Sequence, residues 1–282
     1  MSRRGAIVTK KNNWRAFVFT ALITATFYAT SAAAADCTRR ELAATVNAYF
    51  KALTAHHAGG LPLTRHAGFT ENGMPKDFGE GFWKTAGAVR LKRSALDTQT
   101  CGTVTQAIIE EDGKPIIFGV RLKLEHGRIS EAETLLARAK DFAFKPQGVL
   151  DTAGQDWEGI LPVKDRTPRE VMIRAAHNYY DMFAKEPTAS VPFGKPCDRW
   201  ENGTQTTKNG DCSPKGLVIR QPPRRIPVVD EEAGIVVAFI HFAHSLPDMH
   251  MFKMKDGKVI LVQAVIGSRA PSTGWPIEEA PQ

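Results

Sequence analysis

The tripeptide Glu-Asn-Gly occurs twice in this chain, at residues 71–73 and again at residues 201–203, which is 130 residues later. The same spacing relates further segments: Tyr49-Phe50 to Tyr179-Tyr180, Leu61-Pro62-Leu63 to Val191-Pro192-Phe193, and Leu122-Lys123-Leu124 to Phe252-Lys253-Met254. A spacing that is kept at both ends of a long segment indicates one structural unit used twice. The chain is therefore predicted to contain two copies of one domain.

Residues 1–35 have the features of a secretory signal peptide. Basic residues precede an apolar run from Ala16 to Ala35, which ends in four alanines. This order is typical of exported proteins, and we expect cleavage just before Asp36. An uncleaved membrane anchor is the alternative, because about 20 apolar residues can cross a bilayer. The expected location is secreted or periplasmic after cleavage near Ala35, without stable membrane insertion.

Most of the net charge of +7 comes from this segment. It carries five basic residues and no acidic one, so the rest of the chain has a net charge of +7 − 5 = +2. Such a balance lacks the electrostatic footprint of a nucleic-acid-binding protein, and none is expected as a partner. The one local basic cluster, Arg220, Arg224 and Arg225, is expected to be a solvated loop.

All four cysteines follow the predicted signal peptide, and an even number in an oxidising compartment favours disulfides. Cys197 and Cys212 lie close together in the second copy and are expected to pair. Cys37 and Cys101 then pair within the first copy. Neither pair has a Cys-x-x-Cys or zinc-ligand spacing, so neither redox catalysis nor a metal site is expected.

Each copy is predicted to begin with helices and to continue as a sheet. Thr38 and Glu41 form a capping box before an apolar face at helical spacing, and Thr167 with Pro168 starts the equivalent helix. Residues 61–69 are interpreted as a short helix or an irregular segment. The predicted strands are 91–99, 103–111, 116–125 and 128–137 in the first copy, and 226–231, 235–243, 249–255 and 258–267 in the second.

These elements divide the chain into four parts. They are a signal peptide (1–35), a first domain (36–138), a linker (139–166) and a second domain (167–277). The linker is rich in proline and glycine and shows little periodicity, and we expect Trp157 at the interface between the domains.

A long helix, a short second helical segment and a strongly curved antiparallel sheet resemble the SnoaL-like fold, also called nuclear-transport-factor-two-like. More specifically, the run from Val191 to Thr207, which contains Cys197-Asp198-Arg199-Trp200-Glu201-Asn202-Gly203, and the late Ser272-Thr273-Gly274-Trp275 resemble an exported family of tandem SnoaL-like domains. The expected fold class is α+β, with two tandem SnoaL-like cone domains. Each has N-terminal helices packed on a curved antiparallel sheet.

The resemblance implies a cone-shaped apolar pocket in which poorly solvated polar groups have shifted pKa values. Enzymes that resemble this fold move protons with a His and a carboxylate, or with a lone carboxylate, and need no cofactor. A small-molecule ligand is therefore expected, with a cofactor-independent lyase, isomerase or dehydratase as the leading function. Because the fold does not fix function, a binding module or a structural protein stays open, as does a homo-oligomer or a pairing of the two domains with each other.

His241 and His250 are the expected catalytic residues. They lie on predicted strands of the second domain, where His250 is expected to sit opposite His241 and, together with Asp248, to transfer protons, with metal binding as the alternative for the same residues. The first copy has Ile109 and Val120 at the corresponding positions, so a site is expected in the second domain. The sequence contains no serine-hydrolase elbow, phosphate loop, dinucleotide fingerprint or His-Glu-x-x-His motif, which argues against those enzyme classes.

Five residues of the second copy are candidates for substrate binding: Tyr179, Tyr180, Arg199, Glu201 and Gln263. The tyrosines lie on an apolar helix face, so core packing is the alternative, and Arg199 suits a ligand with a carboxylate. In the first copy, His66 and Glu71 are secondary candidates. Because Glu-Asn-Gly is present in both copies, a turn that maintains the fold is the favoured interpretation of this motif.

Overall fold

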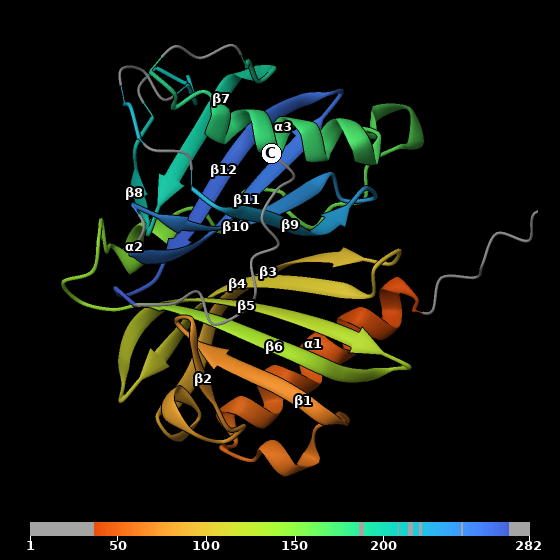
Figure 1. The fold of residues 1–282 in the computed structure, drawn as a ribbon, viewed down its shortest axis with the longest axis vertical. Coiled ribbons are helices and arrows are strands. Elements are labelled where there is room, and N and C mark those ends of the chain that lie inside the picture. Colours follow the sequence, from red (N-terminus) through yellow and green to blue (C-terminus); the bar gives the residue numbers. More distant parts are fainter. Residues whose placement is uncertain are drawn as a thin grey trace, which may run out of the picture. The chain divides into compact units, whose positions relative to one another are not determined.

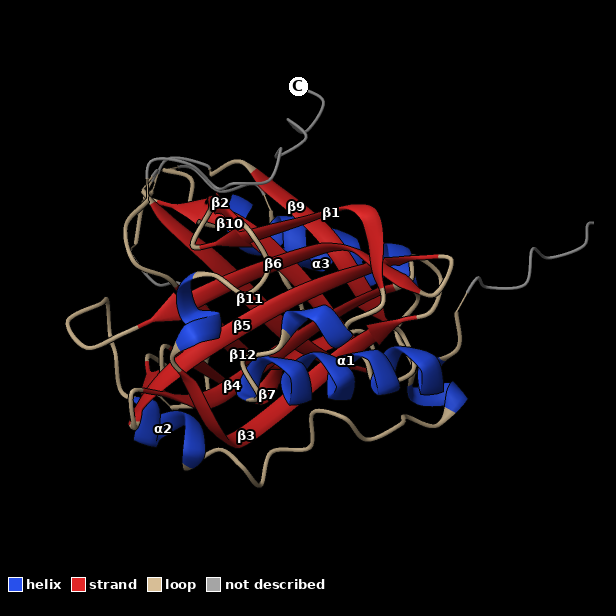
Figure 2. Ribbon diagram, turned by 90° about the horizontal axis from the view of Figure 1, so that it is seen from below, coloured by secondary structure: helices blue, strands red, loops and turns tan. Residues whose placement is uncertain are grey.

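The computed structural model describes residues 37–185, 189–207, 209–213, 217–219, 222–243 and 245–270. All of them belong to one compact unit, Ala35–Gln282. The predicted signal peptide and the run from Ser272 to Trp275 lie outside the described residues. Strands dominate the described chain, and they form two sheets of six strands (Figure 2).

The first sheet follows helix α1 (Arg39–Thr54), which lies against it (Figure 1). Its strands are β1 (Leu63–Glu71), β2 (Met74–Lys76), β3 (Ala86–Asp97), β4 (Gly102–Glu111), β5 (Lys114–Glu125) and β6 (Arg128–Ala137). They are arranged in the order β2-β1-β6-β5-β4-β3. Two short 3-10 helices, η1 (Ala58–Gly60) and η2 (Gly81–Lys84), precede β1 and β3. We refer to α1 through β6 as the first domain.

The second sheet repeats this arrangement after helix α3 (Arg169–Asp181). Its strands are β7 (Phe193–Glu201), β8 (Thr204–Gln205), β9 (Arg224–Asp230), β10 (Ile235–Phe242), β11 (Leu246–Lys255) and β12 (Lys258–Ile266). Their order is β8-β7-β12-β11-β10-β9, the same as in the first sheet. We refer to α3 through β12 as the second domain. Between the domains lie α2 (Pro146–Leu150) and η3 (Val163–Asp165). The predicted class of two tandem α+β cone domains is confirmed.

Both long helices bury the apolar faces that their sequences predict. The α1 capping box between Thr38 and Glu41 is present, and the helix buries Leu42, Val46, Tyr49, Phe50 and Leu53. Helix α3 begins at Arg169, after Pro168, without a side-chain cap. Instead of capping the helix, the hydroxyl of Thr167 accepts the backbone N–H of Gly257 at 3.0 Å, which ties the start of α3 to the β11–β12 turn.

The prediction of a helix or irregular segment at residues 61–69 is wrong, because most of this segment belongs to strand β1. β1 runs parallel to β6, and its counterpart β7 runs parallel to β12, so each sheet is mixed rather than wholly antiparallel. β1 is only partly buried and has an irregular register against β6. It therefore lacks the strict alternation of apolar and polar residues by which a strand is recognised in a sequence.

The repeated Glu-Asn-Gly motif forms the turn after β1 and after β7. Asn72 and Asn202 have positive φ angles of 45° and 43°, and the glycine after each has 78° and 81°. Two successive positive φ angles define the Asn-Gly turn that suits a tight hairpin. Asn72 also donates to the carbonyl of Leu136 and accepts its N–H, at 3.1 and 2.7 Å, and Asn202 bonds Ile266 in the same way at 2.8 and 2.9 Å. The asparagine thus holds the turn against β6 in the first domain and against β12 in the second.

Both predicted disulfides, Cys37–Cys101 and Cys197–Cys212, are present. Each closes a loop within its own domain. Two disulfides fit an oxidising location such as the periplasm or the cell exterior. No helix in the described part of the chain is long and apolar enough to cross a membrane.

The two sheets pack against each other through an apolar core that is separate from the cores under α1 and α3. This core draws on strands of both sheets, such as Ile108 and Ile117 of the first and Val237 and Met251 of the second. Trp157 of the linker is 2% exposed and belongs to the same core. The face of each sheet that does not carry the helix is therefore covered by the other domain.

A symmetric pair of contacts joins the domains at one edge of this core. Arg39 at the start of α1 binds Asp230 at the end of β9, and Arg169 at the start of α3 binds Asp97 at the end of β3, each at 2.7 Å. Each carboxylate also accepts a backbone N–H from the other sheet at 2.9 Å. The arginines are 130 residues apart and the aspartates 133, so matching residues of the two copies exchange the same contacts. We call this arrangement the Arg-Asp clasp.

The same interface also contains a buried ion cluster whose residues are not repeated in the two copies. Glu133 of β6 binds Arg225 of the second domain and Arg121 of its own sheet. The expectation that Arg224 and Arg225 belong to a solvated loop is wrong, because both begin strand β9. Arg225 lies over the ring of Phe239 at 4.8 Å, and Arg224 binds Asp181 at 2.6 Å.

Candidate functional site

His250 and Asp248 form a buried pair on β11. They are 4% and 1% exposed, and His250 Nδ1 lies 3.0 Å from Asp248 Oδ1. Burial raises the pKa of Asp248, and the neighbouring His250 opposes this shift. When Asp248 is ionised, it holds the proton of the imidazole on Nδ1 and leaves Nε2 as a basic nitrogen. The pair is therefore built as a general base oriented by a carboxylate.

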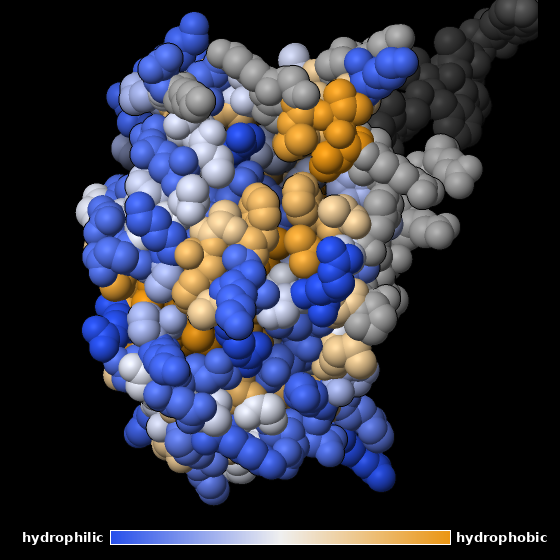
Figure 3. All heavy atoms as spheres, turned by 90° about the vertical axis from the view of Figure 1, so that its left-hand side faces the viewer, coloured by the Kyte–Doolittle hydropathy of each residue, from blue (hydrophilic) through white to orange (hydrophobic). Residues whose placement is uncertain are grey.

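This imidazole lines a pocket of about 60 Å³ within the second domain. Most of the lining is apolar and comes from Phe142, Phe183, Leu217, Ile219, Ile240, Phe242 and Ile266. The other lining side chains are Tyr179, Tyr180, Glu201 and His250. Phe142 and Leu217 are 46% and 49% exposed, so the rim of the pocket is an apolar surface. Hydrophobic atoms also gather in a patch on one face of the molecule (Figure 3).

Helix α3 places its two tyrosines against the imidazole. The ring centroids of Tyr179 and Tyr180 each lie 5.7 Å from that of His250. The hydroxyl of Tyr179 accepts a hydrogen bond from Arg199 Nη1 at 3.1 Å. Burial raises the pKa of Tyr179 to about 12, and it raises the pKa of Tyr180 well above the usual value. Both phenols are therefore protonated at neutral pH and do not act as bases.

Arg199 does not line this pocket, although the sequence proposed it for binding a carboxylate ligand. Its Nε donates to Thr206 Oγ1 at 3.0 Å, and its Nη1 bonds Tyr179 and the carbonyl of Cys212. It also lies 3.6 Å from the carboxylate of Glu201, which does line the pocket. The structure therefore makes Arg199 a support for Tyr179 and Glu201.

The expected pairing of His241 with His250 is wrong. His250 lies opposite Ala238 on β10, and His241 lies opposite Pro247. β11 begins at Leu246, three residues before the predicted strand, because proline is tolerated near a strand start. By strand alternation, His241 shares the face of Val237 and Phe239, which packs on the other domain, rather than the face of Ala238 that packs under α3. His241 and His250 therefore do not meet in one cavity.

Gln263 also faces away from the pocket. Its neighbour Val262 on β12 belongs to the core under α3, and Val265, two residues further on, belongs to the inter-domain core, so alternation places Gln263 on the inter-domain face. There its Nε2 lies 3.4 Å from Thr152 Oγ1 and 3.3 Å from Gln155 Oε1. This position contradicts the interpretation of Gln263 as a substrate-binding residue that faces the pocket.

The equivalent region of the first domain is filled by its own aromatic side chains. Phe118 and Val120 occupy the positions of Asp248 and His250. The ring of Phe118 lies 5.8 Å from Phe50 and 5.4 Å from Phe82. The first domain thus has no histidine–carboxylate pair at this place.

The secondary candidates in the first domain are not brought together as a site. His66 is exposed on β1. The carboxylate of Glu71 accepts the backbone N–H of Phe82 at 2.7 Å and so holds η2 in place. This role agrees with the interpretation of the Glu-Asn-Gly motif as a structural element.

A larger cleft, of about 460 Å³, lies beside the Arg-Asp clasp. Its lining includes Asp97 and Asp230, whose carboxylates are already bound by arginines and backbone amides. We therefore place the candidate site in the smaller pocket, where the polar groups converge. Within the described ranges, no group of three or more His, Cys, Asp or Glu side chains is arranged to hold a metal ion.

Sequence reasoning missed the part of the pocket wall that comes from outside the sheet. Phe142 belongs to the linker, and Leu217 and Ile219 belong to the irregular segment before β9. Neither segment has a periodicity that would indicate which way a side chain points. The aromatic character of Phe142 was one signal, but Phe144 of the same linker packs on the inter-domain core instead.

Beside the pocket, His177 offers a prediction for stability. Its Nδ1 accepts a hydrogen bond from Arg224 Nε at 3.0 Å, and burial together with Arg224 lowers the pKa of His177. The unfolded chain then binds a proton more readily than the folded one, so stability is expected to fall as the pH drops below about 6.5. Urea unfolding between pH 7.5 and pH 5.5 should show a weaker pH dependence in His177→Gln than in the wild type, and identical slopes would contradict this.

Comparisons with known proteins found a family model for part of the chain and several solved structures of low sequence identity. The family model for a domain of unknown function (DUF8021) matches residues 165–266, and no curated protein matches the sequence. An NTF2-like protein of unknown function from Cytophaga hutchinsonii shares 16% identity over 34% of this chain and 89% of its own, with a TM-score of 0.28. A similar protein from Burkholderia xenovorans shares 15% over 36% and 88%, with a TM-score of 0.29. A steroid delta-isomerase from Pseudomonas aeruginosa shares 15% over 40% and 89%, with a TM-score of 0.28.

Proposed function

We propose that this is an exported protein of the tandem SnoaL-like type that binds a small organic molecule in the second domain and moves a proton on it without a cofactor. Export is supported by the basic and apolar order of residues 1–35 and by the two disulfides. The function is supported above all by one observation. A histidine oriented by a buried carboxylate forms one wall of an otherwise largely apolar pocket.

In this proposal His250 Nε2 accepts a proton from a C–H or O–H bond of the ligand. Asp248 stabilises the imidazolium that forms, because it already accepts the Nδ1 proton. The phenols of Tyr179 and Tyr180 are protonated, and their rings lie 5.7 Å from the imidazole. In this proposal the hydroxyl of Tyr179, which accepts from Arg199 and keeps its own proton, polarises an oxygen of the ligand. An elimination or an isomerisation needs no more than this set of groups.

A test of this reaction class does not require knowledge of the substrate. Small carbonyl compounds are incubated with the protein in D₂O, and the exchange of their acidic C–H protons is followed by NMR. We expect exchange with the wild type, a loss of about 10²-fold or more in His250→Asn, and no change in the matched control His241→Asn. Equal rates in His250→Asn and the wild type would overturn the assignment of the base.

The alternative is a module that binds its ligand without reaction. The apolar rim formed by Phe142 and Leu217 favours it, because such surfaces bind ligands without any chemistry. Ligands that shift the melting temperature, with none of them exchanging protons, would support this second function.

A further inference from the structure

We propose that the pocket of the second domain selects a ligand that carries a positively charged amine, with Glu201 as the counter-ion. This inference rests on the proposed function, in which the pocket holds a small organic molecule, and it names the chemical class of that molecule. Three observations carry it: the sign of the charge in the pocket lining, the unused acceptor capacity of Glu201, and the aromatic walls.

The first observation is the sign of the charge. Among the described lining residues, Glu201 is the one acidic side chain, and none is a lysine or an arginine. Arg199 lies outside the lining, and its guanidinium donates hydrogen bonds to Tyr179, Thr206 and the carbonyl of Cys212. A ligand carboxylate would therefore meet Glu201 in an apolar pocket without a lining cation to offset the repulsion.

The second observation comes from a comparison of the two copies of the motif. In the first domain, Glu71 accepts the backbone N–H of Phe82 at 2.7 Å. In the second domain, no described residue donates a hydrogen bond to the side chain of Glu201, and its one ion-pair partner is Arg199 at 3.6 Å. An ionised carboxylate only accepts hydrogen bonds, so the ligand group that faces Glu201 must be a donor.

The third observation is the nature of the walls. Tyr179, Tyr180, Phe142, Phe183 and Phe242 all line the pocket. The faces of aromatic rings attract cations, and aromatic side chains around a carboxylate are a favourable environment for an ammonium group. A neutral hydroxyl would satisfy Glu201 as a donor, but it would gain neither this attraction nor the strength of a charge-assisted hydrogen bond. The chemistry of the lining therefore favours an amine over an alcohol or a carboxylate.

The inference can be tested with three probes of similar shape: phenethylamine, phenethyl alcohol and phenylacetate. Binding to the mature protein is measured by calorimetry and by ligand-detected NMR. We expect the amine to bind about tenfold more tightly than the alcohol, and phenylacetate more weakly than both. In Glu201→Gln, the preference for the amine over the alcohol should disappear. In the matched control Glu125→Gln, which removes an exposed carboxylate of the first domain, the preference should be unchanged.

The outcomes separate this inference from the proposed function. If the alcohol or phenylacetate binds the wild type as tightly as the amine does, the charge assignment is overturned while the pocket stands. This comparison needs no variant, so it holds even if Glu201→Gln fails to fold. If none of the three probes binds, the inference is overturned, whereas the assignment of His250 as the base is decided by the proton-exchange experiment.

Discussion

Replacement of Glu133 by glutamine is expected to destabilise the protein by about 3–5 kcal/mol, because it removes one partner from a buried ion cluster. The Glu133 side chain is 3% exposed, and its partners Arg121 and Arg225 are 5% and 14% exposed. Arg225 has no other carboxylate within ion-pair distance among the described residues, and its burial already lowers its pKa. The substitution leaves its charge in the interface without compensation.

The measurement is urea unfolding of Glu133→Gln, Arg225→Met and the double variant. Since the double variant removes both charges, its loss of stability should be at least about 1 kcal/mol smaller than the sum of the single losses. Glu131→Gln is the matched control. Glu131 binds the same Arg121 but is 19% exposed, and its loss should have a much smaller effect. Additive losses would show that Glu133 and Arg225 are not coupled.

This ion cluster also explains why the first domain pairs with the second domain rather than a second domain with another second domain. The Arg-Asp clasp has equivalent residues in both copies, so it would serve equally well between two second domains. Glu133 has no such equivalent, because the second domain has Gln263 at the matching position. A pair of second domains would leave Arg225 facing a neutral amide. Glu133 therefore favours the pairing of the first domain with the second.

The sequence predicted what depends on local patterns. The α1 capping box, the apolar helix faces, most strands and the Cys197–Cys212 disulfide follow from residues close together in the chain. The Cys37–Cys101 pair then follows from the two cysteines that remain, and the repeated spacing adds the equivalence of the two copies. Two of the failures depend on partners distant in sequence. β1 is a strand only because β6 lies beside it, and Arg225 is buried only because Glu133 reaches it from the other domain.

The candidate site shows the same limit. His250 and Asp248 are two residues apart on one strand, so alternation alone places them on one face. The position of His241 depended instead on where the β10–β11 hairpin turns, and a strand start displaced by three residues moved His241 to the other face. Phe142 and Leu217 lie in irregular segments, where no periodicity in the sequence indicates which side chains line the pocket.

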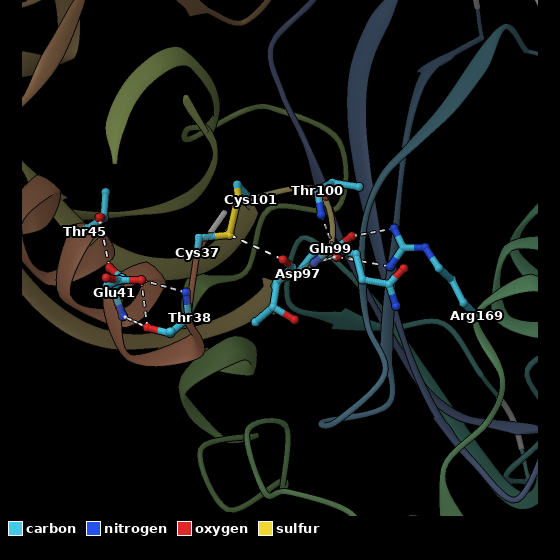
Figure 4. Close-up of a disulfide and its surroundings, with 10 residues drawn as sticks. Cys37, Thr38, Glu41, Thr45, Asp97, Gln99, Thr100, Cys101 and Arg169 are labelled. Atoms are coloured by element: carbon cyan, nitrogen blue, oxygen red, sulfur yellow. Dashed lines mark hydrogen bonds and ion pairs between the residues drawn. A yellow bond between two sulfur atoms is a disulfide. The ribbon is translucent and has the colours of Figure 1, made fainter. Parts of the chain in front are cut away.

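Removal of the Cys37–Cys101 disulfide, in the double variant Cys37→Ser with Cys101→Ser, is expected to destabilise the protein by about 4 kcal/mol. The bridge spans 64 residues, and closing so long a loop removes much of the conformational freedom of the unfolded chain. It also joins the start of α1 to the turn after β3, which carries Asp97 (Figure 4). Asp97 accepts the N–H groups of Gln99 and Thr100 in this turn and binds Arg169 of the second domain.

The Cys197–Cys212 disulfide is the internal control. It spans 15 residues, so its loss is expected to cost about 3 kcal/mol, less than that of the longer loop. The two double variants should also differ in their effect on the Arg-Asp clasp. Loosening the turn that carries Asp97 should reduce the effect of a further Arg169→Gln substitution, because the clasp is already impaired, whereas loss of Cys197–Cys212 should leave that effect unchanged. Unfolding in urea measures both differences, and a larger loss for the shorter loop would mean that loop closure does not dominate the contribution of these bridges.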